Sequence, residues 1–185
     1  MEFRQNEKTA LFIDGPNLFA TAKSLEFDID YGQLLAFFRK RCSLFRATYY
    51  TTVAEGDGIS PVRPLLDWLD YNGYTIVDKP VKSSHSQDDF RRDRGNVYVE
   101  FTIDVLRLAP RVDHIVIFSG DREYTALVNE LRQRGTRVSV VSTLETQPPM
   151  VADDLRRAAD QFVDLADLEP EIARDMVDSR GSNSK

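Results

Sequence analysis

Short apolar runs alternate with segments of helical spacing along most of this chain. The runs are rich in β-branched and aromatic residues, which is typical of buried strands. They span residues 9–14, 43–53, 74–79, 114–118 and 137–141, with a shorter extended piece at 161–165. Helical patterns fill the intervals around residues 17–24, 31–38, 61–72, 95–109, 124–134 and 152–159. This alternation predicts a parallel sheet with crossover helices, and therefore an α/β fold.

Two sequence signals set expected helix starts. Asp30 is expected to cap the second helix, because a short acidic side chain can accept a hydrogen bond from the free amides of a first turn. Ser60 followed by Pro61 predicts a third helix that begins at the proline, where no amide hydrogen is needed.

The chain has 185 residues, about the size of one compact domain. We predict a single domain over residues 1–168 and a C-terminal tail over residues 169–185, whose polar end is expected to be disordered. One cysteine and two histidines cannot assemble the usual soft-ligand zinc sites. Any metal is therefore expected to be a hard cation held by oxygen atoms, such as Mg²⁺ or Mn²⁺.

Hydropathy and charge limit where the protein is expected to act and what it is expected to bind. No apolar run approaches the roughly 20 residues that a membrane-spanning helix needs, and the first ten residues are charged rather than apolar. We therefore expect no membrane association and a cytoplasmic location. The net charge of −6 and the pI near 5.0 count against broad, nonspecific coating of nucleic acid. They still allow an enzyme that holds its substrate through a local basic patch.

Two of the predicted strands end in an acidic residue at the turn into the next helix. Asp14 closes the first strand in the stretch LFIDGPN, and Asp121 follows the fourth strand in IFSGDRE. Ligands of open parallel sheets sit outside the carboxyl ends of the strands. The two carboxylates would share one site if their strands are neighbours, which the local sequence does not decide. Taken singly, each aspartate is more simply explained as a helix N-cap.

A third carboxylate lies on the helix before the fourth strand. The buried stripe of this helix is expected to consist of Val97, Phe101, Val105 and Leu108. Asp104 lies within or beside this stripe, and Glu100 lies one turn earlier on the same side. Two such carboxylates repel each other, and a divalent ion would neutralise them. An ion pair between Asp104 and Arg107 is the structural alternative.

Three longer stretches carry a more specific pattern: IDGPNLF at residues 13–19, RGNVYVEFTIDVLRLA at residues 94–109, and SGDREYTALVNELRQRGTRVSVV at residues 119–141. They resemble the NYN domains of the LabA-like type, which belong to the PIN-like nuclease superfamily. The resemblance extends over residues 9–165, nearly the whole folded part. It implies a three-layer α/β/α sandwich around a central, mostly parallel sheet of five or six strands, in which the first and fourth strands are neighbours. It also implies a ribonuclease that depends on Mg²⁺ or Mn²⁺.

The resemblance assigns roles to individual acidic residues. The expected catalytic carboxylates, which would also bind the metal, are Asp14, Asp104, Asp121 and Glu123. Glu100 is expected as a further ligand. Two positions depart from the usual family pattern, because Tyr98 and Glu123 both stand where the family usually has aspartate. A tyrosine with its ordinary high pKa is a poor Mg²⁺ ligand, so Glu100 would have to compensate for Tyr98.

The bound ion would activate water for in-line attack on phosphorus, which leaves a 5′-phosphate and a 3′-hydroxyl. The expected substrate-binding residues are Asn17, Ser119, Arg122 and, in a polar loop, Lys82, Arg91, Arg92 and Arg94. Each of these residues also has a structural explanation. Asn17 and Ser119 could be turn and cap residues, and Arg122 could be an exposed residue of a first helical turn. The loop could be solvated, with its arginines paired to neighbouring aspartates. The expected partner is RNA in single-stranded form, and the sequence leaves a homodimer open.

A second class of function fits the same residues. A nonenzymatic RNA-binding or regulatory module would keep the acidic pocket and lose turnover because of Tyr98. A nucleotide-binding protein is less consistent with the chain, which has neither G-x-G-x-x-G after the first strand nor G-x-x-x-x-G-K-[ST] anywhere. A receiver-like phospho-acceptor would need a pair of acids where a lone Asp14 precedes Gly-Pro.

Overall fold

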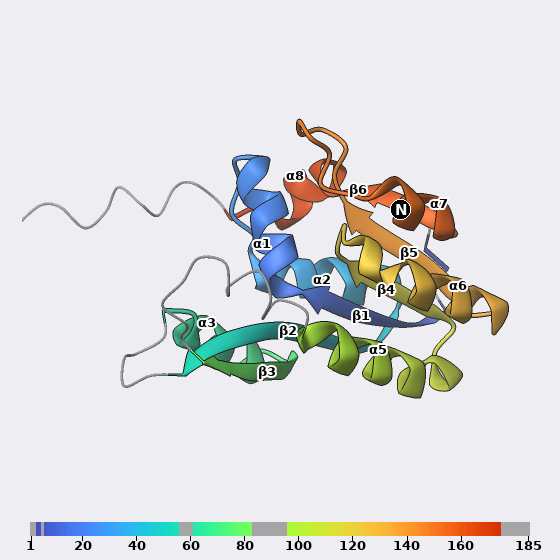
Figure 1. Ribbon diagram of the computed structural model, residues 1–185, viewed down its shortest axis with the longest axis horizontal. Helices are drawn as coiled ribbons and strands as arrows, with labels where there is room; N and C mark the ends of the chain where they lie inside the picture. The colour runs from blue at the N-terminus through green and yellow to red at the C-terminus, as the bar shows by residue number, and fades with distance from the viewer. Residues whose placement is uncertain (1–2, 5, 56–60, 83–95, 175–185) are drawn as a thin grey trace, which may run out of the picture.

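Six parallel strands form one central sheet. The computed structural model of the protein describes residues 3–4, 6–55, 61–82 and 96–174. The strands are β1 (Lys8–Asp14), β2 (Ser43–Glu55), β3 (Thr75–Lys82), β4 (His114–Phe118), β5 (Arg137–Ser142) and β6 (Gln161–Asp164). Their order across the sheet is β3-β2-β1-β4-β5-β6, and every neighbouring pair is parallel (Figure 1). The predicted parallel sheet is confirmed, and the short extended piece forms its sixth strand.

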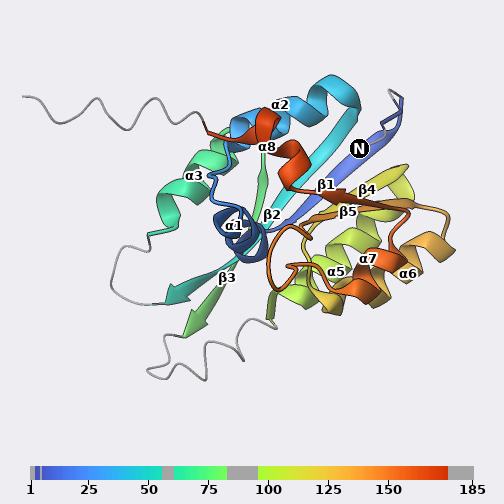
Figure 2. The ribbon, with the colours of Figure 1, turned by 90° about the horizontal axis from the view of Figure 1, so that it is seen from above.

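Helices cover both faces of the sheet and give the molecule three layers. The α-helices are α1 (Gly15–Ser24), α2 (Tyr31–Arg41), α3 (Arg63–Tyr71), α5 (Asn96–Leu108), α6 (Thr125–Gln133), α7 (Asp153–Ala158) and α8 (Glu169–Ile172). Short 3-10 turns are η1 (Ala109–Arg111), η2 (Arg122–Tyr124) and η3 (Ala166–Leu168). Helices α2, α3 and α8 lie on one side of the sheet, and α5, α6 and α7 lie on the other (Figure 2). The α/β/α sandwich is thus confirmed. Among the helices that the structure describes, none is both long and apolar enough to cross a bilayer.

Alternate residues of the central strand β1 point to opposite layers. Leu11 and Ile13 share a core with residues of α1 and α2, whereas Ala10 and Phe12 share a core with residues of α5 and α6. All four side chains are almost completely buried. The continuous apolar run that predicted this strand is explained by its position, because the strands of a parallel sheet are covered on both faces.

The chain reverses its direction across the sheet next to β1. From β1 it runs outward through β2 to β3, and it then returns to β4 on the other side of β1. The strands β1 and β4 are therefore neighbours, with Ile13 level with Phe118. The connections that leave two such strands diverge to opposite faces and open a crevice at their carboxyl ends. Asp14 is the last residue of β1, and Asp121 follows the end of β4.

One predicted helix start is confirmed and another is wrong. Asp30 caps α2 through a hydrogen bond from a first-turn amide. The third helix is predicted from Pro61, but this residue lies in a turn and α3 begins at Arg63. Pro64 occupies the first turn of α3, where a missing amide hydrogen costs nothing, so the helix starts around this second proline. The predicted cap, Ser60, lies outside the described residues.

The folded unit continues beyond the predicted domain end at residue 168. Helix α8 packs against α2, and its Ile172 is completely buried. Arg41 of α2 pairs with Glu171 at 2.5 Å. Residues 169–174, assigned to the tail from sequence, therefore pack on the domain, because α8 supplies an apolar side chain that a polar tail would lack. The predicted disordered end falls beyond the described residues.

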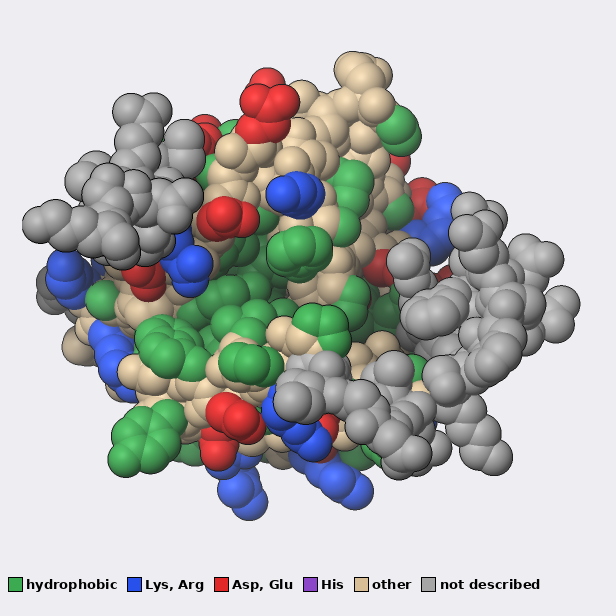
Figure 3. All heavy atoms as spheres, turned by 90° about the vertical axis from the view of Figure 1, so that its left-hand side faces the viewer, with side chains coloured by type: hydrophobic (Ala, Val, Ile, Leu, Met, Phe, Trp, Pro, Cys, Tyr) green, Lys and Arg blue, Asp and Glu red, His purple; other side chains and the backbone are tan. Residues whose placement is uncertain are grey.

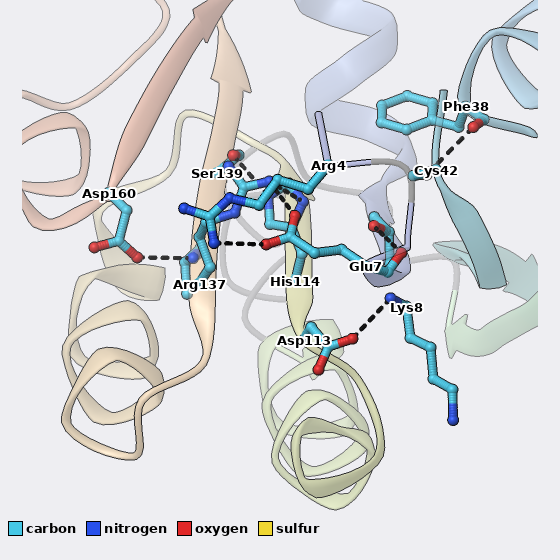
Figure 4. Close-up of polar contacts among 12 residues, drawn as sticks. Arg4, Glu7, Lys8, Phe38, Cys42, Asp113, His114, Arg137, Ser139 and Asp160 are labelled. Atoms are coloured by element: carbon cyan, nitrogen blue, oxygen red, sulfur yellow. Dashed lines mark hydrogen bonds and ion pairs between the residues drawn. The ribbon is translucent and has the colours of Figure 1, made fainter. Parts of the chain in front are cut away.

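A buried polar cluster closes the opposite, amino edge of the sheet (Figure 4). His114 begins β4, and its Nε2 lies 2.8 Å from Oγ of Ser139. The guanidinium of Arg137 lies 3.1 Å from Nδ1 of His114 and 2.6 Å from a carboxylate oxygen of Glu7. Burial, and then the positive charge of Arg137, lower the pKa of His114 to about 3. The ring is therefore neutral, and it lies at the edge of the sheet away from the crevice.

Candidate active site at the carboxyl edge of the sheet

Asp14 is both the last residue of β1 and the N-cap of α1. Its Oδ1 accepts a hydrogen bond from the Asn17 amide at 3.2 Å. Its Oδ2 accepts hydrogen bonds from the hydroxyls of Ser119 and Tyr124, each at 3.3 Å. The residue is only 9% exposed. Helix capping, the simpler explanation of Asp14 in the sequence, is confirmed, and its place at the end of β1 also brings the carboxylate to the crevice.

The electrostatic setting of Asp14 is unfavourable to its charge. Burial raises the pKa of Asp14 to about 6, and the negative charge of Asp121 adds to this rise. The hydrogen bonds from Asn17, Ser119 and Tyr124 act in the opposite direction, because they stabilise the ionised form. A cation near both aspartates would lower the pKa of Asp14 and relieve their repulsion.

Ser119 links the two aspartates. Its hydroxyl donates to Asp14, and its oxygen accepts a hydrogen bond from the Asp121 amide at 3.2 Å. Asp121 caps η2, because its Oδ1 accepts a hydrogen bond from the Glu123 amide at 3.2 Å. Ser119 is buried, and its hydroxyl is engaged in both directions, so it holds the carboxylates in place.

Asn17 joins the loops that follow β1 and β4. Its Oδ1 accepts a hydrogen bond from the Gly120 amide at 3.0 Å, across a separation of 103 residues. A Cβ atom on Gly120 would lie 1.9 Å from the carbonyl oxygen of Met150, so only glycine lets the backbone pass there. Asn17, which the sequence assigned to substrate or to a turn, therefore fixes the position of the residue before Asp121.

Tyr98 reaches the crevice from the first turn of α5. Its hydroxyl donates a hydrogen bond to Oδ2 of Asp121, and its ring packs edge to face with Tyr124 at a centroid separation of 5.3 Å. Burial, and then the hydrogen bond to Asp121, raise the pKa of Tyr98 above its ordinary value. The phenol therefore stays protonated. Where the resemblance leads us to expect an aspartate, this chain places a neutral donor on one oxygen of Asp121.

Asp104 and Glu100 face other partners. Oδ2 of Asp104 accepts a hydrogen bond from the Tyr50 hydroxyl at 3.2 Å, and Arg107 lies 3.9 Å from its Oδ1. Glu100 pairs with Lys79 at 2.6 Å, and this hydrogen bond lowers the pKa of Glu100. Within the described ranges, no three acidic, histidine or cysteine side chains are grouped so that they could hold one metal ion. The predicted convergence of three carboxylates is therefore reduced to the aspartate pair at the crevice.

The two residues that follow Asp121 lie on the surface. Glu123 is exposed. Arg122 pairs with Asp154 at 3.3 Å, and both side chains are about two-thirds exposed. An ion pair this exposed adds little stability, so it hardly restrains Arg122. The predicted substrate residues Arg91, Arg92 and Arg94 lie outside the described residues, as does the side chain of Lys82.

Two tyrosine hydroxyls belong to this region, although the sequence pattern predicts no polar role for either. The spacing of Tyr124 predicts core packing, and the ring is indeed completely buried. Tyr50 in β2 is equally buried. Both hydroxyls bond to aspartates, Tyr124 to Asp14 and Tyr50 to Asp104. The available signal was physical, because a buried tyrosine hydroxyl needs a hydrogen-bond partner and carboxylates near the strand ends offer one.

The face onto which the strands open is shown in Figure 3. Hydrophobic side chains gather across the middle of this face around a hollow, and charged side chains lie around them. Helices α1 and α3 carry the exposed aromatic side chains Phe19, Trp68 and Tyr71. The carboxyl side of the molecule therefore combines buried carboxylates with exposed apolar surface.

Comparison with known proteins identifies the class to which this fold and crevice belong. The chain matches the model of the NYN domain family over residues 8–168 and belongs to that family. Membership places it in the PIN-like nuclease superfamily and indicates an RNA-related, nuclease-like function.

One relative and one solved structure are similar to this chain over most of its length. The chain is 33% identical over 172 residues to the "Low amplitude and bright protein LabA" of Synechococcus elongatus, covering 91% of this chain and 88% of LabA. It shares its fold with the crystal structure of a protein of unknown function from Vibrio parahaemolyticus, with a TM-score of 0.69 and 23% identity. That match covers 94% of this chain and all of the other. The resemblance to the LabA-like type is thus confirmed.

Proposed function

We propose that this protein hydrolyses phosphodiester bonds of single-stranded RNA with a divalent cation held by Asp14 and Asp121. The observation that carries the proposal is the meeting of these carboxylates at the crevice between β1 and β4. Burial and the charge of Asp121 together raise the pKa of Asp14 to about 6 there. Membership of the NYN domain family supports the choice of RNA as substrate.

The donor set at the crevice fits Mg²⁺ or Mn²⁺. Mg²⁺ is commonly held by one or two carboxylates, while water and substrate phosphates complete its coordination shell. Asp14 and Asp121 supply two carboxylates, and Glu123 lies near enough to act electrostatically on Tyr98 at the same place. Such an ion supplies Lewis-acid chemistry, which polarises a phosphate and activates water near neutral pH.

The chain's own residues orient this pair. Ser119 and Tyr124 hold Oδ2 of Asp14, and Asn17 fixes the loop that carries Asp121. We assign Glu123 a supporting role, because it follows Asp121 closely and is exposed toward solvent.

Asp104 and Glu100 take a smaller part in the proposal than the sequence suggested. Asp104 would have to leave the Tyr50 hydroxyl, and Glu100 would have to leave Lys79, before either could reach the cation. Each such move would replace an existing hydrogen bond by a metal contact. We therefore do not count Asp104 and Glu100 among the residues that hold the cation.

The test is cleavage of single-stranded RNA in Mn²⁺ by the full chain beside the variants Asp14→Asn and Asp121→Asn. Each variant is expected to lose at least about 100-fold in rate, because even outer-shell partners of metal ligands are worth about 10–100-fold. Asp70→Asn, an exposed change on α3, is the matched control and should keep full activity. Equal cleavage by all four proteins would point to a contaminating nuclease and would remove the proposal.

A second candidate is an RNA-binding or regulatory module without turnover. The bond from Tyr98 to Asp121 favours it, because the phenol occupies an oxygen that a cation would use. In this case the parent chain binds RNA but does not cleave it in Mn²⁺, and Tyr98→Asp restores cleavage by supplying the third carboxylate. Cleavage by the parent chain would exclude this candidate.

A further inference from the structure

A groove of about 430 Å³ runs beside α5 on the α5 side of the sheet. It is bounded by α5 and η1 on one side and by β2 and β3 on the other. Its lining combines the buried rings of Phe12 and Tyr50 with three exposed arginines, Arg46, Arg107 and Arg111.

The groove is basic in a chain whose net charge is −6. Three arginines line it against a single carboxylate, Asp104, which already accepts the Tyr50 hydroxyl. Arg107 lies 3.9 Å from Asp104, whereas Arg46 and Arg111 form no ion pair with any acidic side chain in the part of the chain that the structure describes. A local excess of positive charge that none of the described acidic side chains neutralises is typical of a binding site for anions.

The groove begins next to the crevice and leads away from it. Tyr50 is level with Asp14 in the pairing of β1 with β2, so its strand position lies about 4.8 Å away. Arg46 lies on the same face of β2, roughly 13 Å farther toward the amino edge. On the facing side, the helical path from Asp104 to Arg111 covers roughly 10 Å. The arginines therefore line a path that continues from the aspartate pair.

We propose that this groove binds the phosphate backbone of single-stranded RNA that extends from the crevice, with Arg46, Arg107 and Arg111 contacting the phosphates. The inference deepens the proposed function and rests on it. A guanidinium presents a planar fork of donors that matches a phosphate, and it stays charged at any physiological pH. Domains that bind double-stranded RNA span about 16 base pairs, far more than the roughly 13 Å between Arg46 and Tyr50 along β2, so we assign the groove to a single strand.

A larger cavity of about 630 Å³ lies at the amino edge, but its chemistry is different. Its Arg4 and Arg137 both pair with Glu7, at 3.4 Å and 2.6 Å (Figure 4). Its Arg134 pairs with Glu130 at 2.7 Å. The cations of that cavity are neutralised by the protein's own acids, so the groove beside α5 is the better phosphate site.

The test measures binding of a short single-stranded oligoribonucleotide in EDTA, where no turnover occurs, as a function of salt. For single strands, each phosphate contact contributes about 0.7 to the slope of log K against log salt concentration. Arg46→Gln/Arg111→Gln is therefore expected to flatten the slope by about 1.4 and to lower affinity about tenfold at low salt. The control, Lys8→Gln/Lys40→Gln, removes the same charge from exposed positions outside the groove and should leave the slope unchanged.

Equal slopes for the groove variant and the control would overturn the inference. Cleavage in Mn²⁺ is scored separately, so the two proposals fail independently. If the parent chain binds with the steeper slope but never cleaves RNA, the proposed function is refuted and the groove inference stands. If the parent chain cleaves RNA but its binding does not depend on Arg46 and Arg111, the groove inference is refuted and the proposed function stands. Absence of binding by the parent chain at low salt overturns the groove inference, and the cleavage assay still decides the proposed function.

Discussion

The hydroxyl of Tyr98 donates a hydrogen bond to Oδ2 of Asp121, which connects the first turn of α5 with the loop after β4. The same ring packs against Tyr124, whose hydroxyl bonds to Asp14. Two aspartates and two protonated tyrosines thus form one connected unit. Compared with a site of three carboxylates, this unit carries one negative charge fewer, and its attraction for a divalent cation is correspondingly weaker.

Replacing Tyr98 with phenylalanine is expected to increase the response to Mn²⁺. The change removes the donor from Asp121 and exposes that oxygen to a cation. Without metal, the variant should lose about 1.5–3 kcal/mol of stability, which is typical of a hydrogen bond to a charged group. With metal, the rise in melting temperature should exceed that of the parent chain, because an ion that binds the folded state stabilises it. Tyr71→Phe, at a 95% exposed ring, is the control. The same Mn²⁺ response in parent and variant would contradict this interpretation.

Asp14→Asn is expected to stabilise the metal-free protein near neutral pH. The folded-state pKa of Asp14 is raised to about 6 from 3.8, so its stabilising contribution is complete below pH 3.8 and is lost as the pH rises through 6. A shift of about two pKa units corresponds to about 3 kcal/mol of free energy of unfolding. The gain in stability from asparagine should be smaller, because its amide group replaces an oxygen that accepts hydrogen bonds. Urea unfolding in EDTA should show a gain near pH 7 that shrinks near pH 4. A variant less stable than the parent at both pH values would refute the assignment.

Gly120→Ala is expected to destabilise the fold and to abolish cleavage. The new methyl group would lie 1.9 Å from the carbonyl oxygen of Met150, so the loop that carries Asp121 must move. Overpacking of this kind commonly costs about 1–3 kcal/mol. Thermal unfolding and cleavage assays would measure both effects. In the control Gly32→Ala, the nearest atom is a carboxylate oxygen of Asp30 at 3.1 Å, and the change should stay within about 1 kcal/mol. Full activity in Gly120→Ala would show that this loop position is not critical.

His114 is expected to make the fold sensitive to acid. Its pKa is lowered to about 3 in the folded state from 6.5, so the stability it provides is complete above pH 6.5 and falls as the pH drops toward 3. The loss should approach about 1.4 kcal/mol for each pH unit in that window. Urea unfolding of the parent chain and of His114→Gln should show a difference at pH 7 that narrows by this amount per unit on acidification. A difference that stays constant with pH would mean that the histidine is not buried in its neutral form.

Local pattern was sufficient to predict most of the fold. A continuous apolar run such as residues 9–14 indicates a strand covered on both faces, and β1 is such a strand. The start of α3 was missed because two prolines, Pro61 and Pro64, both satisfy the local rule for a first turn. The packing of α8 on α2 could not be predicted from the sequence, because a four-residue helix shows too little spacing to reveal its buried side.

The sequence by itself determined that Asp14 and Asp121 stand at strand ends and that Asp104 lies beside the buried stripe of its helix. Only the tertiary structure decided which of these carboxylates meet. Asp14 and Asp121 come together because β4 returns beside β1, whereas Asp104 meets Tyr50, 54 residues away in the chain. Spacing along a strand or helix fixes the side on which a residue lies, since it depends on local backbone geometry. Which residue it contacts on that side depends on the order in which distant strands pair, and no local spacing encodes that order.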